Sequence, residues 1–427
     1  MSKVFFTILS FFIASVTSNL SAQNDTLYKV FIANGGTFEF NPPFVDRTSV
    51  GVYEPYQEAY SVVDSVQVES VQDMVSDGEF VYLAAQDSII KYNVFTNSRV
   101  ASIPFAGILS LHFIDNYLIA GKYYGAEPFV VAYSKNLDSL FAISGIDNTV
   151  SGVAKLGDSL YVSFNVTGSS FIDTLGRLAV VDLNTKTLVK IVELDTAGAG
   201  ATSVFAHNGK VYIIASNTGN LLEYDVTDGG LTTYHLDITD IGYSNWFELH
   251  NGLLYAQMGN AIATFNFNNA QTNTVLDLAN LSSPSFFLAA AAFDTINQHF
   301  YLTYSDYATG GYCLVYDTAA TRIDSFQTGI ASEALALVYR TGPVGVEETK
   351  AQVGVKVFPN PFGNEMVVEY NSAKAANCRL TDLSGHIWFQ NSINSSYHID
   401  TKDLPAGIYL LHLENSEFSS TKKLLKF

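Results

Sequence analysis

Apolar and polar residues alternate with a period of two along Val71–Ile103, in runs that turn residues separate. The runs are VQDMVSD, FVYLAA, IIKYNV and RVASI, and Asp77 and Gly78 stand between the first two. This alternation predicts four short antiparallel strands joined by tight turns. A single sheet of this kind has two exposed faces and little core of its own. We therefore expect it to be one unit of a repeated array.

The pattern recurs in five further stretches: 108–145, 150–194, 202–236, 245–278 and 286–329. Each of the six units has a tyrosine in its predicted second strand, and subtraction gives spacings of 35 to 51 residues. These residues are Tyr82, Tyr117, Tyr161, Tyr212, Tyr255 and Tyr301. A period of about 40–50 residues is typical of the four-stranded blades of a β-propeller.

The two ends of the array complete one another. Leu27–Gly35 matches a second strand, and residues 48–55 and 60–66 match a third and a fourth. The missing first strand is EALALVYR, Glu333–Arg340. A blade built from both ends closes the ring and removes two free sheet edges. The sequence thus predicts an all-β protein with a seven-bladed β-propeller closed by a composite blade, in residues 24–340.

The first 23 residues have the features of a signal peptide. Lys3 precedes an apolar run from Val4 to Val16, and small residues lead to a predicted cleavage after Gln23. The run is too short to span a bilayer comfortably, and no later segment has the ~20 uninterrupted apolar residues of a transmembrane helix. Mature protein is expected to begin near Asn24. The cleavage region contains no cysteine, which argues against a lipid anchor.

The formal net charge is −19 and the pI about 4.6, which argues against nucleic acid or anionic lipid as a partner. Hydrophobic residues make up 48% and aromatic residues 13% of the chain, as suits packed sheets. The only cysteines, Cys313 and Cys378, fall in different predicted domains, so no disulfide between them is expected.

Residues 341–354 interrupt the strand pattern with Gly, Pro and charged residues and are predicted to be a linker. Residues 355–427 then resume a different pattern of short strands, which predicts a small C-terminal β-sandwich. Four motifs stand out in it: VFPNPF at 357–362, DLSG at 382–385, LPAGIY at 404–409 and the basic KKLLK at 422–426. The prolines are expected to fix a turn, and Gly385 and Gly407 to permit turn conformations.

This tail resembles the C-terminal (Por) sorting domain of the type IX secretion system of Bacteroidota. The residues that carry the resemblance are Pro359, Asn360, Pro361, Gly385, Gly407, Tyr409, Lys422 and Lys423. The resemblance implies the type IX secretion machinery as a partner. It also implies passage through the periplasm to the outer-membrane cell surface or the medium, commonly with removal of the tail.

The array itself resembles the YncE-like and YVTN-repeat propellers through its DG or NG turns, its VYI or VYL strands and its VVDL strand. These are scaffold features. The opening, residues 27–55, looks like the start of surface propellers of the same bacteria. Some of those capture vitamin B12 or act beside nutrient-uptake systems, so the resemblance implies ligand binding.

Motifs for catalysis are absent from the sequence. None of its histidines forms HxH or HExxH, and there is no GxSxG elbow, P-loop or Asp-x-Asp-x-Asp calcium loop. Asp77, Asp158, Asp182, Asp225 and Asp317 recur at blade turns, where Asx hydrogen bonding explains them. We therefore assign no catalytic residue, metal or cofactor. An enzyme stays possible, because a propeller can assemble an active site from several blades.

The links between second and third strands differ in length. Those at Gln86–Ser88, Asn217–Asn220 and Gly259–Asn260 are short, whereas those at Asn34–Arg47, Lys122–Pro128, Asn165–Gly176 and Ser305–Gly311 are long. These links, and those that lead into first strands, should share one face of the ring. They hold aromatic and asparagine side chains that suit a polar ligand with flat faces, such as a glycan or a corrinoid.

The predicted ligand-binding residues are Asn34, Phe40, Phe44, Tyr123, Tyr124, Asn165, Phe171, Asn217, Asn245, Trp246 and Tyr307. Two alternatives to a ligand-binding protein stay open. One is a propeller enzyme of the lyase or lactonase type, and the other is a protein-interaction platform with a flat loop face.

Overall fold

The structure is a computed structural model that describes residues 25–37, 48–168, 172–241, 246–279, 281, 285–341, 355–370, 374–382, 385–415 and 419–426. The chain divides into two compact units, of which one is Asp25–Gly342 and the other includes Pro343–Phe427. In the described residues the regular structure is β-strand except for one short turn of 3-10 helix, η1 (Thr196–Gly198). No helix in the described ranges is long and apolar enough to cross a membrane.

The larger unit is a ring of four-stranded antiparallel sheets, in which consecutive strands pair in sequence order. Six of these blades come from consecutive segments: β4 (Asp73–Ser76), β5 (Phe80–Ala85), β6 (Ser88–Asn93) and β7 (Ser98–Pro104); β8 (Ile108–Ile114), β9 (Tyr117–Lys122), β10 (Val130–Tyr133) and β11 (Ser139–Ile143); β12 (Val150–Leu156), β13 (Ser159–Thr167), β14 (Asp173–Asp182) and β15 (Thr187–Asp195); β16 (Ala201–His207), β17 (Lys210–Ala215), β18 (Asn220–Tyr224) and β19 (Leu231–His235); β20 (Phe247–His250), β21 (Leu253–Met258), β22 (Ala261–Asn266) and β23 (Gln271–Asp277); β24 (Phe287–Asp294), β25 (His299–Ser305), β26 (Gly311–Asp317) and β27 (Arg322–Thr328).

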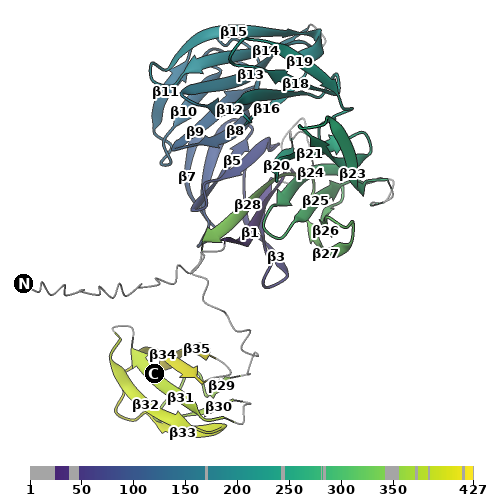
Figure 1. The fold of residues 1–427 in the computed structure, drawn as a ribbon. Coiled ribbons are helices and arrows are strands. Elements are labelled where there is room, and N and C mark those ends of the chain that lie inside the picture. The colour runs from purple at the N-terminus through teal and green to yellow at the C-terminus, as the bar shows by residue number, and fades with distance from the viewer. Residues whose placement is uncertain are drawn as a thin grey trace, which may run out of the picture. The chain divides into compact units, whose positions relative to one another are not determined.

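The remaining blade joins the two ends of the unit, as the sequence predicts. Its strand order is β28 (Ser332–Thr341), β1 (Asp25–Asn34), β2 (Ser49–Glu54) and β3 (Ala59–Ser65). β28 and β1 run antiparallel, with pairs from Asp25 and Thr341 to Asn34 and Ser332. Figure 1 shows the light green β28 beside the purple β1. The described residues therefore form seven blades, and the predicted composite blade is confirmed.

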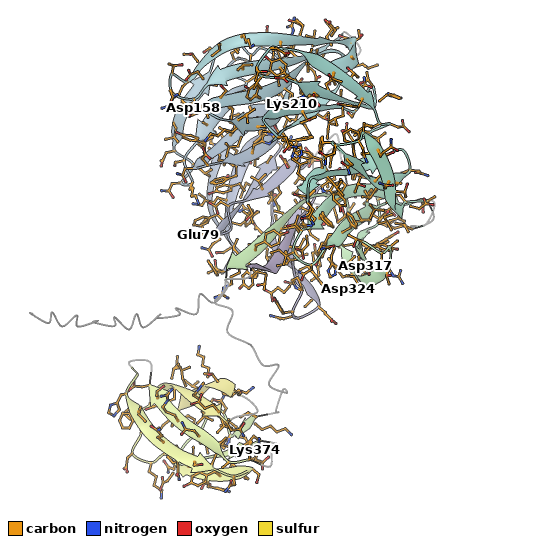
Figure 2. All side chains as sticks on the ribbon, viewed as in Figure 1. Glu79, Asp158, Lys210, Asp317, Asp324 and Lys374 are labelled. Atoms are coloured by element: carbon orange, nitrogen blue, oxygen red, sulfur yellow. The ribbon has the colours of Figure 1, made fainter. Side chains whose placement is uncertain are left out.

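The period-two pattern places alternate residues of each strand in the cores on either side of its blade. In β5, Val81 and Leu83 pack into the cluster shared with the composite blade. Tyr82 and Ala84 pack into the cluster shared with the following blade. Figure 2 shows side chains filling the spaces between the sheets. Burial of one such large apolar side chain stabilises the fold by about 1.5–3 kcal/mol, so each blade depends on both neighbours.

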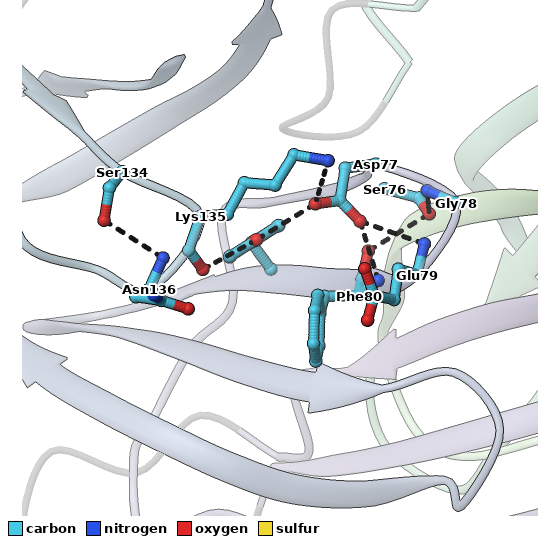
Figure 3. Close-up of polar contacts among 9 residues, drawn as sticks. Ser76, Asp77, Gly78, Glu79, Phe80, Ser134, Lys135 and Asn136 are labelled. Carbon is cyan, nitrogen blue, oxygen red and sulfur yellow. Dashed lines mark hydrogen bonds and ion pairs between the residues drawn. The ribbon is translucent and has the colours of Figure 1, made fainter. Parts of the chain in front are cut away.

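Asp77 shows how a repeated turn also fastens adjacent blades (Figure 3). Its Oδ1 accepts the backbone N–H groups of Glu79 and Phe80 at 3.0 and 2.7 Å, which is the expected Asx turn. Its Oδ2 lies 3.2 Å from the Nζ of Lys135 in the next blade. The Tyr82 hydroxyl lies between them and donates to Asp77 Oδ2 at 3.2 Å or to the Lys135 carbonyl at 3.0 Å.

The smaller unit is a β-sandwich. One sheet has the order β29 (Lys356–Phe358), β30 (Glu365–Glu369) and β33 (Ser396–Asp400). The other has the order β32 (Ile387–Ile393), β31 (Ala376–Asp382), β34 (Gly407–Glu414) and β35 (Ser419–Lys426). Their inner faces share one apolar core, which includes Met366, Leu380 and Leu411. Cys313 in the larger unit and Cys378 in this core are both free and buried.

The first and last motifs of the tail hold one another. The side chain of Asn360 accepts the backbone N–H of Leu425 at 2.9 Å and donates to the Lys423 carbonyl at 3.3 Å. Phe362 is buried, and its N–H donates to the Leu425 carbonyl at 2.9 Å. Lys423 itself is exposed, as is its neighbour Lys422. The PNPF turn thus fixes the C-terminal strand and leaves its basic residues on the surface.

The two glycines of the tail motifs behave differently. Gly385 has φ 87°, the turn conformation that the sequence predicts. Gly407 begins β34 and pairs with Lys426, so the prediction of a turn at Gly407 is wrong. The turn residues lie just before it, and the Tyr409 hydroxyl donates to the Pro405 carbonyl across them at 2.7 Å.

Candidate functional site

The links between second and third strands and the links into first strands lie at one end of the ring, here called the loop face. Two of the four predicted long links between second and third strands are long, at 35–48 and 123–129. The predicted long links at Asn165–Gly176 and Ser305–Gly311 are shorter, at five residues each, because β13 continues to Thr167 and β14 begins at Asp173, and because β25 continues to Ser305 and β26 begins at Gly311. Asn165 and Gly176 face one another within the hairpin of β13 and β14.

Asn34 is buried and serves the closure of the ring. Its Oδ1 accepts the Gly329 N–H at 3.1 Å and the Ser332 hydroxyl at 2.7 Å. Its Nδ2 donates to the hydroxyls of Ser49 at 3.1 Å and Tyr60 at 3.0 Å. All of its hydrogen-bonding capacity is directed to the protein, so Asn34 has none left for a ligand.

Asn165 is buried for a similar reason. Its Nδ2 donates to the Ala201 carbonyl at 3.2 Å, and its Oδ1 accepts the Ala201 N–H at 2.8 Å. Ala201 begins the first strand of the next blade, so this paired contact sets the spacing of two blades. Both amide atoms of Asn165 are therefore already bonded within the protein and are not free to contact a ligand.

The other predicted residues of the loop face are exposed or lie elsewhere. Tyr123 and Tyr124 form an exposed edge-to-face pair with ring centroids 6.0 Å apart. Asn217 is exposed, and its Nδ2 lies 3.4 Å from the Asp173 carbonyl. Trp246 lines a cavity in the central channel. Phe40, Phe44, Phe171 and Asn245 lie outside the described residues.

Tyr307 lines a pocket of about 360 Å³ where the loop face meets the channel. We call this the loop-face pocket. Its lining comes from the links after β1, before β4, between β25 and β26 and before β28, and from the starts of β8 and β28. It comprises Gly35, Gly36, Glu69, Ser70, Val71, Gln72, Leu109, Tyr307, Ala331 and Glu333. It thus combines an aromatic ring, apolar walls and two carboxyl groups.

Glu333 is the most deeply buried of the polar residues in this pocket, and neither it nor Glu69, Ser70 or Gln72 was predicted as a site residue. Its side chain is only 5% exposed, and burial raises the pKa of its carboxyl to about 7. A Cβ at Gly35 would lie 2.6 Å from Glu333 Oε2, so the carboxyl needs glycine at that position. One signal was present in the sequence: Glu333 is an acidic residue directly before the apolar run Ala334–Tyr339 of the closing strand.

Stability should therefore decrease with rising pH because of Glu333. Its pKa in the folded state lies above the ordinary value of 4.5, so the folded protein retains a proton that the unfolded chain releases. The contribution of the protonated Glu333 carboxyl to stability is fully present below about pH 4.5 and is lost as the pH rises through about 7. Glu333→Gln should be more stable than the parent by about 3 kcal/mol at pH 8, with a much smaller difference at pH 4.5.

Urea unfolding of parent and variant at the two pH values measures this difference. Glu58→Gln, at an exposed turn, is the control for loss of one charge. A difference between Glu333→Gln and parent that did not change with pH would contradict the prediction.

A second cavity, of about 220 Å³, lies in the channel among the starts of the inner strands. Asp73 and His112 line it. Burial raises the pKa of Asp73 to about 6 and lowers that of His112 to about 4. Asp73 Oδ2 accepts the Leu111 N–H at 2.8 Å, and His112 Nε2 lies 2.8 Å from the Ser151 carbonyl. Across the described ranges, no group of three or more His, Cys, Asp or Glu could hold a metal ion.

The tail matches a known family. Residues 356–426 match the family described as the secretion system C-terminal sorting domain. This confirms the resemblance of the tail: it is a sorting domain of the type IX secretion system. The protein is therefore exported through this system, by way of the periplasm, to the cell surface or the medium.

Solved structures show the same fold for the larger unit. A candidate 6-phosphogluconolactonase from Bacteroides uniformis is similar with a TM-score of 0.51 at 12% identity, covering 73% of this chain and 99% of that one. Its counterpart from Bacteroides fragilis gives 0.50 at 13% identity, covering 73% and 98%. The WD40 repeats of RRP9 give 0.50 at 13% identity, covering 65% and 86%. At such low identity, the structural similarity establishes the β-propeller fold but carries no information about activity. Among curated proteins, none matches the chain.

Proposed function

We propose that this exported propeller binds a sugar unit, such as the end of a glycan, in the loop-face pocket. The observation that supports this most is the combination of Tyr307, the apolar walls and the buried carboxyl of Glu333 in one cavity. A sugar ring has an apolar face that packs on an aromatic side chain and hydroxyl groups that donate to carboxyl oxygens.

The volume of the pocket favours a sugar over a corrinoid. Ligand pockets usually measure about 300–1,000 Å³, and this one, at about 360 Å³, is near the lower limit. A corrinoid is a macrocycle with many side groups, so it would have to lie across the mouth of the pocket. A single sugar unit could enter.

The charges of the pocket disfavour a phosphorylated sugar. Glu69 and Glu333 contribute carboxyl groups, and the lining includes no lysine, arginine or histidine. A phosphate placed there would meet like charge and no cation. The pocket therefore does not suit the phosphorylated sugar that the description of the similar Bacteroides structures names.

Calorimetric titration of the mature full chain with neutral mono- and disaccharides tests the proposal. We expect Tyr307→Ala to weaken binding of a sugar that the parent binds by about 1–3 kcal/mol, as for an aromatic anchor. Tyr56→Ala is a matched control, because Tyr56 is 73% exposed in the link between β2 and β3, away from the loop face. Equal binding by parent and Tyr307→Ala, or no binding of any neutral sugar by the parent, would overturn the proposal.

A further inference from the structure

Glu333 in the loop-face pocket differs from the other buried carboxyl groups of the protein. Burial raises the pKa of five carboxyls in the described residues. Four of them also accept hydrogen bonds from the protein, and these belong to Asp73, Asp173, Asp240 and Glu248. Within the described part of the chain, Glu333 has neither a hydrogen bond nor an ion pair to offset its burial. A buried carboxyl without a partner is costly to the fold, so its presence requires a reason.

The Glu333 carboxyl lies at the wall of the pocket. Its Oε2 is the atom that a Cβ on Gly35 would approach to 2.6 Å, and both residues line the cavity. The side chain is shielded almost completely from bulk solvent. A ligand that enters the pocket can therefore supply the partner that the protein does not.

Hydrogen bonds from Ser305 hold the surrounding wall in place. The Ser305 hydroxyl accepts the N–H of Tyr307 at 3.0 Å and the N–H of Ala331 at 2.9 Å. The N–H of Gly35 in turn donates to the Ala331 carbonyl at 2.7 Å. Three segments of the lining are thus joined to one another, so a ligand does not have to order them.

The charged groups around Glu333 are acidic. Glu69 lines the same pocket, and the lining contains no lysine, arginine or histidine. Asp306 lies in the link that carries Tyr307, and bonds from the Thr309 hydroxyl and from backbone N–H groups hold the pKa of its carboxyl below the ordinary range. Positive charge in this pocket must therefore come from the ligand, and the acidic net charge of the protein favours the approach of a cation.

We infer that the sugar unit bound in the loop-face pocket is an amino sugar, and that its ammonium group pairs with the carboxylate of Glu333. This inference rests on the proposed function and names the class of sugar. An ammonium group has three N–H donors, and its hydrogen bonds to a carboxylate are stronger than those of a neutral hydroxyl. A nearby cation also favours the ionised carboxyl, which reverses the effect of burial. The ring of Tyr307 is left to pack on the apolar face of the sugar.

Glucosamine, glucose and N-acetylglucosamine test this inference, because they differ only in the group at carbon 2. Calorimetric titration of the mature full chain at neutral pH gives the three dissociation constants. We expect glucosamine to bind about tenfold more tightly than glucose, as for one charge-assisted hydrogen bond in a buried site. Acetylation removes the positive charge, so N-acetylglucosamine should lose this advantage.

Glu333→Gln tests the role of the carboxylate. The amide has nearly the same shape and no charge, so the preference for glucosamine over glucose should disappear. The exposed Glu58→Gln is the matched control for loss of one negative charge and should keep the preference.

Two results would overturn the inference and leave the proposed function standing. They are equal binding of glucosamine and glucose by the parent, and a preference for glucosamine that Glu333→Gln leaves unchanged. The comparison of the three sugars uses the parent chain, so it remains decisive even if Glu333→Gln fails to fold. Absence of binding by every neutral sugar overturns the proposed function and this inference with it, because the amino group is inferred as a substituent of a bound sugar.

Discussion

Deletion of Glu333–Arg340 is expected to abolish the folded propeller. These residues form most of β28, which pairs with β1 along its length and supplies Ala334, Ala336 and Val338 to a core between blades. Their loss opens the inner edge of β1 and removes the contacts of β28 with both neighbouring inner strands, β24 and β4. The loss of several buried side chains and a full strand pairing is comparable to the about 5–15 kcal/mol that stabilises a typical domain.

The matched control is a chain that ends after Gly342. It lacks the whole tail but keeps β28, and Asp25–Gly342 is a compact unit. Thermal unfolding followed by circular dichroism should give a cooperative transition for the control, close to that of the parent. The strand deletion should show no cooperative transition. An unchanged melting temperature after the deletion would mean that β28 does not close the ring.

The blades could be predicted from the sequence because the strands are short apolar or alternating runs, separated by turn residues, that recur at a regular spacing. In β5, successive residues pack alternately into the two cores on either side of the blade. The repeated tyrosine was a less reliable guide. Tyr117 begins β9 opposite Ile114, whereas Tyr82 is the third residue of β5 and pairs with Val75. Spacing along the chain shows that a unit recurs, but hairpin register decides which residues are equivalent.

The ligand site was harder to predict, because the same residue types serve turns, closure and binding. Asn34 and Asn165 stand at predicted strand ends, where an exposed amide is reasonable, yet both side chains turn inward to the next strand. The loop-face pocket combines Val71, Leu109, Tyr307 and Glu333 from different blades. Only the closed ring brings these residues together, so their position along the chain carries little signal.

The sorting domain could be predicted from its motifs, and the structure shows what each motif does. Asn360 and Phe362 bind the backbone of the last strand, so the first motif is structural. Lys422 and Lys423 are exposed on that same strand, whereas the next residue, Leu424, is buried in the core of the sandwich. We therefore expect Lys422 and Lys423 to be residues of the tail that the secretion machinery contacts.

Deletion of Val355–Phe427 is therefore expected to leave the propeller folded and to hold it in the periplasm, with almost none in the medium or on the cell surface. The reason is that the propeller has its own closed set of cores, whereas the sorting signal lies wholly in the tail. Immunoblots of periplasm, outer membrane and medium measure the distribution, and protease resistance of the periplasmic protein checks its folding. Lys422→Ala with Lys423→Ala should reduce export without unfolding the tail, and Leu424→Ala, which removes buried side-chain atoms, should destabilise it by about 2–5 kcal/mol. Export of the truncated chain at the level of the parent would show that the signal for export lies elsewhere in the protein.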